Sequence, residues 1–269
     1  MPKIADEIKK QAGFSPEQKI NPEELYIYQN LNKLFYAPPN YKEEAKMLKM
    51  QAEKTNTERI GLHASAILAS EKEFCLREQV LSLVYRRCEE RSVGVGLKRI
   101  FTEGDFIHEK WQRLFIRGGL AKAKNMDISF WRNDYFLSYT PDINSSFFPN
   151  GEEYMVEIKS MNTFQFKKIN SHPSAKKQLM LYMALHKKEK GFILVEDKNS
   201  QEFKIFVVYY DKEFIKPYLE RLKEIKLAFN KKDLPKRICK NYDTKRANNC
   251  PMWKACFNVG VVDKICLKK

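Results

Sequence analysis

The sequence lacks the long apolar segments of membrane and secreted proteins. No run approaches the roughly 18 consecutive apolar residues that a transmembrane helix requires. The opening residues, MPKIADEIKK, contain no apolar region of the kind found in a secretory signal peptide. Glycine is scarce, with 10 in 269 residues, and no internal repeat is visible. These absences exclude a membrane protein, a collagen, a coiled-coil rod and a secreted disulfide-rich miniprotein.

Acidic residues are also fewer than basic ones, which indicates a polyanionic partner. The chain has 34 Asp and Glu against 49 Lys and Arg, a formal net charge of +15. Residues 160–190 contain seven lysines and one acidic residue, and residues 231–246 contain seven basic and two acidic residues. Such an excess favours nucleic acid first and an anionic membrane second, although a lysine-rich solubilising surface is the alternative. Apolar residues (43%) and aromatic residues (13%) are sufficient for a packed core.

The order of apolar patterns and turn residues predicts an α/β fold with a mixed central sheet flanked by helices. We expect helices over 22–36, 41–58, 64–88, 102–117, 174–187 and 212–230, and strands over 126–131, 135–140, 154–159, 192–196 and 202–210. Three parts follow from this order: a helical N-terminal appendage (1–60) that packs on the main domain or binds a protein partner, a core (61–230), and a basic, cysteine-bearing tail (231–269).

Two carboxylates and a lysine are the first candidates for chemistry. Asp142 follows the second expected strand, and Glu157 and Lys159 lie in the third. Because a strand alternates its faces, Glu157 and Lys159 project from the same side. Two carboxylates suit a hard divalent cation, which polarises a phosphoryl oxygen and activates water, while an ammonium offsets developing charge. A cross-strand ion pair is the alternative interpretation.

Two helices add polar groups before and after these strands. His108 lies on the expected helix 102–117, and Gln178 and Tyr182 are spaced i, i+4 on one face of the helix 174–187. Without other context, His108 is equally typical of a core or surface histidine, and Gln178 and Tyr182 are typical of an ordinary amphipathic helix.

Together these residues resemble the PD-(D/E)XK nuclease superfamily and, within it, the RecB-like exonucleases. The motifs are Gly-x-x-x-His at 104–108, Pro-Asp at 141–142, Glu-x-Lys at 157–159 and Gln-x-x-x-Tyr at 178–182, in the family's order. The resemblance covers about 100–210 and implies a restriction-endonuclease-like core. It also implies that His108, Asp142 and Glu157 ligate Mg²⁺ or Mn²⁺, that Lys159 is the catalytic lysine, and that Gln178 and Tyr182 position the DNA and the active site. An imidazole ligand shifts the preference toward Mn²⁺.

The basic segment that follows Lys159 is the expected path of the DNA backbone. Its candidate phosphate contacts are Lys167, Lys168, Lys176 and Lys177. Phe164, Phe166 and Tyr182 offer rings on which bases stack, although both phenylalanines are equally typical of a core.

Six cysteines without a signal peptide argue against disulfides. Cys250 and Cys256 form a C-x5-C pair, and Cys239 lies eleven residues before it, so one more thiolate completes a four-sulfur site for zinc or an iron–sulfur cluster. The chain resembles RecB-like nucleases of the four-cysteine type, which implies a [4Fe–4S] cluster with Cys75 as the remaining ligand and Zn²⁺ as the alternative. Cys239 departs from that family's C-x2-C pattern, because position 247 is Ala; Cys88 and Cys266 are therefore reserve ligands, and buried free thiols are the alternative.

The sequence therefore predicts a cytoplasmic, metal-dependent DNA exonuclease that acts on single strands or duplex ends, in phage or bacterial replication, recombination or repair. Two other functions stay open. One is a CRISPR-associated nuclease that trims spacers, and the other is a non-catalytic DNA-binding subunit of a larger complex.

Overall fold

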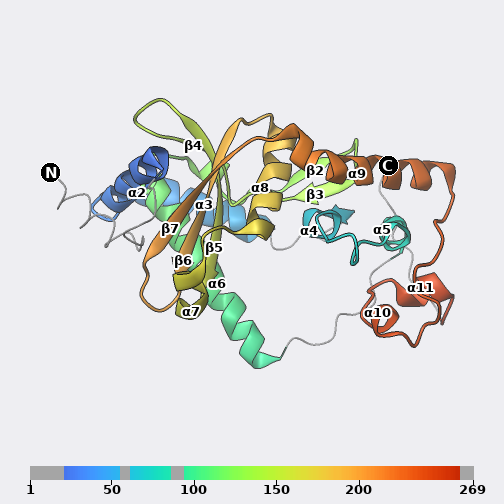
Figure 1. Ribbon diagram of the computed structural model, residues 1–269. Coiled ribbons are helices and arrows are strands. Elements are labelled where there is room, and N and C mark those ends of the chain that lie inside the picture. Colours follow the sequence, from blue (N-terminus) through green and yellow to red (C-terminus); the bar gives the residue numbers. More distant parts are fainter. Residues whose placement is uncertain (1–20, 55–60, 86–93, 261–269) are drawn as a thin grey trace. The chain divides into compact units, whose positions relative to one another are not determined.

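The computed structural model of the protein describes residues 21–54, 61–85 and 94–260, which divide between two compact units (Figure 1). Unit 1 combines Met1–Thr57, Gly96–Ser129 and Thr140–Asp211. Unit 2 combines Glu58–Val95, Phe130–Tyr139 and Lys212–Lys269. These units differ from the three parts expected from the sequence, because each is assembled from three separate segments. No helix among the described residues has the length and apolar content needed to cross a membrane.

Unit 1 contains a mixed four-stranded sheet in the order β4-β5-β6-β7. The central strands β5 and β6 pair in parallel, and both outer pairs are antiparallel. The bounds are Ile143–Phe147 (β4), Glu153–Met161 (β5), Lys190–Asp197 (β6) and Phe203–Tyr209 (β7). The sheet and its flanking helices confirm the predicted fold class, and the strands expected at 154–159, 192–196 and 202–210 are confirmed as β5, β6 and β7.

The strand beside β5 was not expected. β4 has the sequence INSSF, whose three central polar residues hide a strand pattern. Its buried Ser146 satisfies its hydroxyl by donating to the backbone oxygen of Tyr154 on β5 (2.9 Å). The runs 126–131 and 135–140 contribute β2 and β3 to unit 2, and only Met126 of the first run reaches the unit 1 sheet, through an isolated antiparallel bridge to Ile143 of β4.

The helices of unit 1 flank its sheet. They are α2 (Pro22–Leu34), α3 (Tyr41–Lys54), α6 (Val95–Arg117), α7 (Thr163–Lys168) and α8 (Pro173–His186), with a short 3₁₀ turn at Ala123–Asn125. Ile27 and Leu31 of α2 lie in the same buried cluster as Trp111 and Phe115 of α6 and Phe192 of β6. Residues 22–54 therefore complete the core of unit 1, and the rest of the expected appendage, 1–20 and 55–60, lies outside the described residues.

α6 is longer than the sequence indicated. Thr102, where the helix was expected to begin, lies inside it, and the Thr102 hydroxyl donates to the backbone oxygen of Lys98 (3.0 Å). Further along, the fully buried Trp111 donates its indole N–H to Glu196 Oε2 (2.5 Å), and Lys110 pairs with Glu196 Oε1 (2.6 Å). These bonds join α6 to the end of β6.

Unit 2 has a three-stranded sheet in the order β1-β3-β2, where β1 is Leu62–His63, β2 is Phe130–Arg132 and β3 is Leu137–Tyr139. Its helices are α4 (Ala64–Ile67), α5 (Leu76–Ser82), α9 (Lys212–Lys231), α10 (Lys245–Asn248) and α11 (Trp253–Phe257). The single helix expected over 64–88 is wrong. A turn at Ser70–Phe74 separates α4 from α5, closed by the bond from Phe74 N to the oxygen of Ser70 (2.8 Å), so Cys75 precedes α5 instead of lying within a helix.

Candidate active site

Asp142 is held in place at the start of β4 by two different donors. Ile143, the next residue, pairs with Val156 of β5, which brings the Asp142 carboxylate beside the following residues of β5. Asp142 Oδ2 accepts a hydrogen bond from the backbone N–H of Ile158 (2.7 Å), and Oδ1 lies 3.2 Å from His108 Nδ1 on α6. The carboxylate predicted from the second strand thus reaches β5 through β4, a different strand from the one expected.

Glu157 and Lys159 project from the same side of β5, as their spacing predicted. Lys159 Nζ donates to Glu157 Oε1. Glu157 is fully buried, and its Oε2 has no hydrogen-bond partner among the described residues. The Lys159 side chain keeps 27% of its surface exposed. The pair therefore has a buried carboxylate and an ammonium that reaches solvent.

The charges of these groups are strongly interdependent. Burial, followed by the Asp142 charge, raises the pKa of Glu157 to about 7. Burial alone would raise the pKa of Asp142, but the charges of His108 and Lys159 and the hydrogen bonds to Asp142 outweigh it and lower that pKa. The pKa values of Lys159 and His108 are raised, because the carboxylates outweigh the burial that favours their neutral forms. The site thus combines two acidic groups that differ in their affinity for a proton.

These donors fit a divalent cation by their chemistry. Two carboxylates and one imidazole converge on the pairing of β4 with β5, and the buried Glu157 Oε2 has no hydrogen-bond partner among the described residues. In the described part of the chain, however, no group of three or more His, Cys, Asp or Glu side chains is arranged to hold a metal ion. His108 Nδ1 lies against Asp142 Oδ1, and Lys159 Nζ donates to Glu157 Oε1.

Gln178 and Tyr182 lie on one face of α8, as their spacing predicted. Gln178 Nε2 donates to the hydroxyl of Tyr182 (3.1 Å). Tyr182 is only 4% exposed. Burial and the charges of Glu157 and Asp142 raise its pKa, which puts the phenol in the same electrostatic environment as the carboxylates. Their predicted role in positioning DNA stays a prediction.

His172 is a further polar group that the sequence interpretation missed. It caps α8, and its Nδ1 accepts from the backbone N–H of Ala175 (3.3 Å). Burial and the nearby Lys159 charge lower the pKa of His172. The signal was available: a polar residue directly before Pro173 is typical of a helix N-cap.

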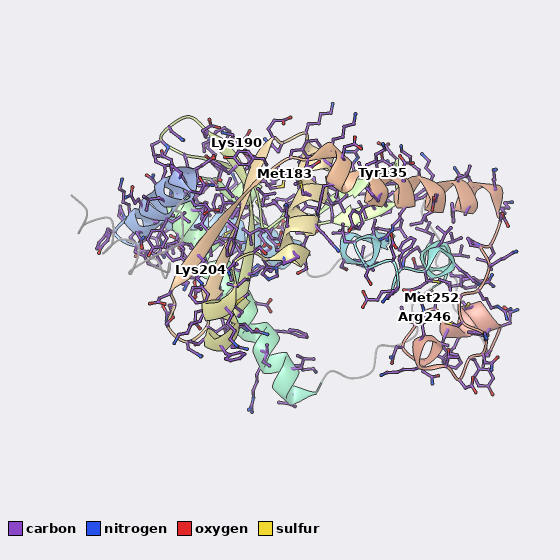
Figure 2. All side chains as sticks on the ribbon, viewed as in Figure 1. Tyr135, Met183, Lys190, Lys204, Arg246 and Met252 are labelled. Carbon is purple, nitrogen blue, oxygen red and sulfur yellow. The ribbon has the colours of Figure 1, made fainter. Side chains whose placement is uncertain are left out.

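The four lysines expected to contact DNA occupy two successive helices. Lys167 and Lys168 end α7, and Lys176 and Lys177 are the fourth and fifth residues of α8. The two phenylalanines of α7 differ sharply in exposure. Phe166 is 2% exposed and belongs to the interior, where Lys204, labelled in Figure 2, donates to its backbone oxygen (2.9 Å). The stacking role considered for Phe166 is therefore wrong.

Phe164, in contrast, is 69% exposed. Its ring lies 3.7 Å from Lys168 Nζ, measured to the ring centroid. An exposed ring beside a cation suits both base stacking and phosphate contact.

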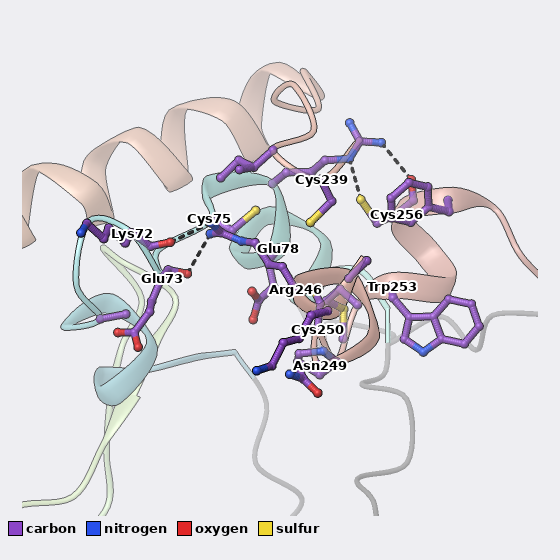
Figure 3. A pocket seen from close by; sticks show the side chains of 18 residues that line it. Lys72, Glu73, Cys75, Glu78, Cys239, Arg246, Asn249, Cys250, Trp253 and Cys256 are labelled. Atoms are coloured by element: carbon purple, nitrogen blue, oxygen red, sulfur yellow. Dashed lines mark hydrogen bonds between the residues drawn. The ribbon is translucent and has the colours of Figure 1, made fainter. Parts of the chain in front are cut away.

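All four described cysteines line a single pocket of about 730 Å³ in unit 2 (Figure 3). They are free thiols: Cys75, Cys239, Cys250 and Cys256. The ten-residue segment between Cys239 and Cys250 folds back, so the departure at position 247 does not separate Cys239 from the others. The reserve residues Cys88 and Cys266 lie outside the described residues.

Two arginines form hydrogen bonds between the segments that line this pocket. Arg77, two residues after Cys75, donates to Cys256 Sγ (3.2 Å) and to the backbone oxygen of Pro235 (2.8 Å). Arg246 donates to the backbone oxygens of three residues that precede Cys75: Lys72 (2.7 Å), Glu73 (3.1 Å) and Phe74 (3.2 Å).

Two thiols of this pocket, those of Cys75 and Cys250, favour their protonated form. Burial, followed by the charge of Glu78, raises the pKa of Cys250 to about 12, and burial raises the pKa of Cys75. The donor set fits a soft metal by its chemistry, since four sulfurs share one cavity. Within the ranges that the structure describes, though, no three of these side chains are close enough together to form a metal-binding group.

Comparisons with known proteins add similarities of fold. No protein-family model and no curated protein matches the chain. The chain is similar to LHK-Exo in complex with dAMP (14% identity over 64% of this chain and 89% of that one, TM-score 0.46) and to SSO0001 (14%, 78% and 93%, 0.39). It is also similar to an alkaline exonuclease, LHK-Exo, from Laribacter hongkongensis (15%, 64% and 89%, 0.40).

Proposed function

We propose that the protein is a divalent-metal-dependent DNA exonuclease that hydrolyses phosphodiester bonds. The observation that carries this proposal is the buried Glu157, whose unpartnered oxygen lies in one site with Asp142, Lys159 and His108. A fully buried carboxylate is costly to a fold, so its position beside a second carboxylate favours a functional role over a structural one.

The residues of unit 1 divide the chemistry between them. Asp142 and Glu157, with His108, would hold the cation, which polarises the phosphoryl oxygen and lowers the pKa of a bound water. The backbone N–H of Ile158 keeps Asp142 oriented. Lys159, which reaches solvent, offsets the negative charge that develops on the phosphoryl group.

The basic side chains of α7 and α8 support DNA as the substrate. Lys167, Lys168 and Lys176 are exposed on the two helices that follow β5. Lysines that neutralise phosphates release counterions, so DNA binding is expected to weaken steeply as salt rises. Single strands and duplex ends are the proposed substrates, and replication, recombination or repair is the proposed context.

Linear and circular substrates distinguish an exonuclease from an endonuclease. The full chain is incubated with Mn²⁺ and either linear single-stranded DNA or the same DNA as a closed circle. We expect the linear form to be degraded to nucleotides and the circle to stay intact, as measured on denaturing gels. Cleavage of the circle at a similar rate would contradict the exonuclease assignment while leaving the nuclease assignment in place.

We also propose that the cysteine pocket of unit 2 holds a [4Fe–4S] cluster, with Zn²⁺ as the alternative. The presence of all four described cysteines around one cavity supports this proposal. Its role is structural: it would join the segment before α5 to the C-terminal segment.

Cys250→Ser is expected to remove the brown colour and the broad visible absorbance of protein purified without oxygen. Because the serine cannot replace a thiolate, the iron and sulfide content per chain should fall severalfold. The fourth ligand is identified by comparing the iron content of Cys239→Ser with that of the matched variants Cys88→Ser and Cys266→Ser. A colourless wild-type protein that contains zinc would favour the alternative, and one without metal would contradict both.

A further inference from the structure

The first turns of α6 carry an apolar stripe that the packing of unit 1 leaves exposed. Leu97, Phe101, Gly104 and His108 follow the spacing i, i+4, i+7, i+11 and therefore lie on one helix face. The same face continues to Trp111, which is fully buried. Leu97 and Phe101, in contrast, are 47% and 54% exposed, and Ile100 beside them is 56% exposed. We call Leu97, Ile100 and Phe101 the α6 stripe.

The α6 stripe adjoins the candidate active site. A Cβ added at Gly104 would lie 3.8 Å from Ser160 Oγ, the residue after Lys159, so α6 approaches the end of β5 at that point. Lys198, which follows β6, donates to the backbone oxygen of Ile100 (2.9 Å) and fixes this part of the helix. The exposed apolar face is thus anchored beside the site instead of being a frayed helix end, and Figure 1 shows these turns extending past the strands of the unit 1 sheet.

Cations accompany the exposed apolar groups. Lys98 lies about 60° around the helix axis from Phe101 and so beside the α6 stripe, Arg99 lies on the opposite side of the same turn, and Lys167 and Lys168 lie on α7, which begins two residues after β5 ends. The neighbouring acidic residues of these segments are Glu103 and Asp105, so the charge balance favours a polyanion. Phe164 on α7 adds a second exposed ring.

We propose that the α6 stripe binds the unstacked bases of a single DNA strand as that strand enters the active site. Apolar and aromatic faces beside lysines are the combination that binds single-stranded nucleic acid: bases stack on the rings, and phosphates contact the cations. This subsite rests on the proposed nuclease function and assigns the substrate's base-binding surface. Phe101 is the principal stacking residue, and Leu97 and Ile100 extend its surface.

Phe101→Ala is expected to weaken binding of a 12-nucleotide single strand about tenfold, because stacking on one ring is lost. Binding is measured by fluorescence anisotropy in a Lys159→Met chain, with EDTA present so that no divalent cation supports cleavage of the DNA. Phe101→Trp should restore or exceed the original affinity. Phe106→Ala is the matched control: Phe106 is 62% exposed on the same helix but lies about 140° around the axis from Phe101, and its loss should change affinity less than twofold.

Other occupants of the α6 stripe give different results. If Phe101→Ala lowers the thermal midpoint of unfolding by several degrees, another segment of this chain covers the stripe. If it converts a dimer to a monomer in light scattering, a second copy covers it. Either result, or unchanged DNA affinity, overturns the proposal.

A dinucleotide substrate tests the nuclease assignment independently of the α6 stripe. Phe101 lies about 10 Å along α6 from His108, at 1.5 Å per residue, so cleavage of a dinucleotide depends on the active site alone. We expect the wild-type and Phe101→Ala chains to cleave the dinucleotide at the same rate. Phe101→Ala should bind the longer strand about tenfold more weakly. Absence of any dinucleotide cleavage by the wild-type chain would count against the nuclease, whereas equal binding of the longer strand by both chains would count against the α6 stripe only.

Discussion

Lys159→Met is expected to lower the rate of DNA hydrolysis at least about 100-fold. The ammonium is the partly exposed cation beside the two buried carboxylates, so it is placed to offset charge that develops on the phosphoryl group. Methionine keeps the length and apolar stem of the side chain but not its charge. The rate is measured as nucleotide release from end-labelled single-stranded DNA with saturating Mn²⁺.

The choice of methionine follows from the ion pair with Glu157. Alanine would remove the ammonium that pairs with the buried Glu157 carboxylate and would also leave a cavity. Methionine limits the change to the loss of the charge. Lys167→Met, the same substitution on the exposed end of α7, is the matched control and should keep most of the activity at low salt. Full activity in Lys159→Met, with wild-type circular dichroism, would contradict the assigned role.

Glu157→Gln is expected to remove both metal-dependent activity and metal-dependent stabilisation. A cation that binds the folded state at about 100 times its dissociation constant stabilises it by about 2.7 kcal/mol, which raises the unfolding midpoint of a chain of this size by roughly 5 °C. The amide retains the shape of the side chain but cannot supply an anionic oxygen to the cation. Hydrolysis should therefore fall at least about 100-fold, and Mn²⁺ should no longer raise the midpoint.

Glu202→Gln tests whether any loss of carboxylate has this effect. Glu202 is exposed beside β7, so the substitution should leave the Mn²⁺-induced shift and the activity unchanged. A Glu157→Gln protein that still gains about 5 °C with Mn²⁺ would show that the cation binds elsewhere.

The sequence predicted the parts of the site that depend on local periodicity. Alternation along β5 was enough to bring Glu157 and Lys159 to one side, and helical spacing was enough to pair Gln178 with Tyr182. Which strand supplies Asp142 was not predictable, because β4 is polar and gains its stability from pairing with β5 and from the Ser146 hydrogen bond. Local strand propensity does not predict such contacts between distant residues.

Local sequence patterns also did not predict how the chain divides into two units. Residues 130–139 read as part of a continuous run of strands, yet β3 within them pairs with β1, more than 60 residues earlier, and both β2 and β3 belong to unit 2. Similarly, the apolar spacing over 64–88 matched one helix, but the turn at Ser70–Phe74 interrupts it and leaves Cys75 at the wall of the pocket. The burial of Phe166 beside the exposed Phe164 depends on which side of α7 packs, which the sequence alone did not determine.

The most direct measurement is a crystal structure of the full chain grown with Mn²⁺ and examined for anomalous scattering. We expect an anomalous peak bound by the carboxylates of Asp142 and Glu157, with Lys159 turned away from Glu157 Oε1. A peak at other side chains, or no peak in a protein that digests DNA in the same Mn²⁺ concentration, would contradict the assignment of these carboxylates as the cation site.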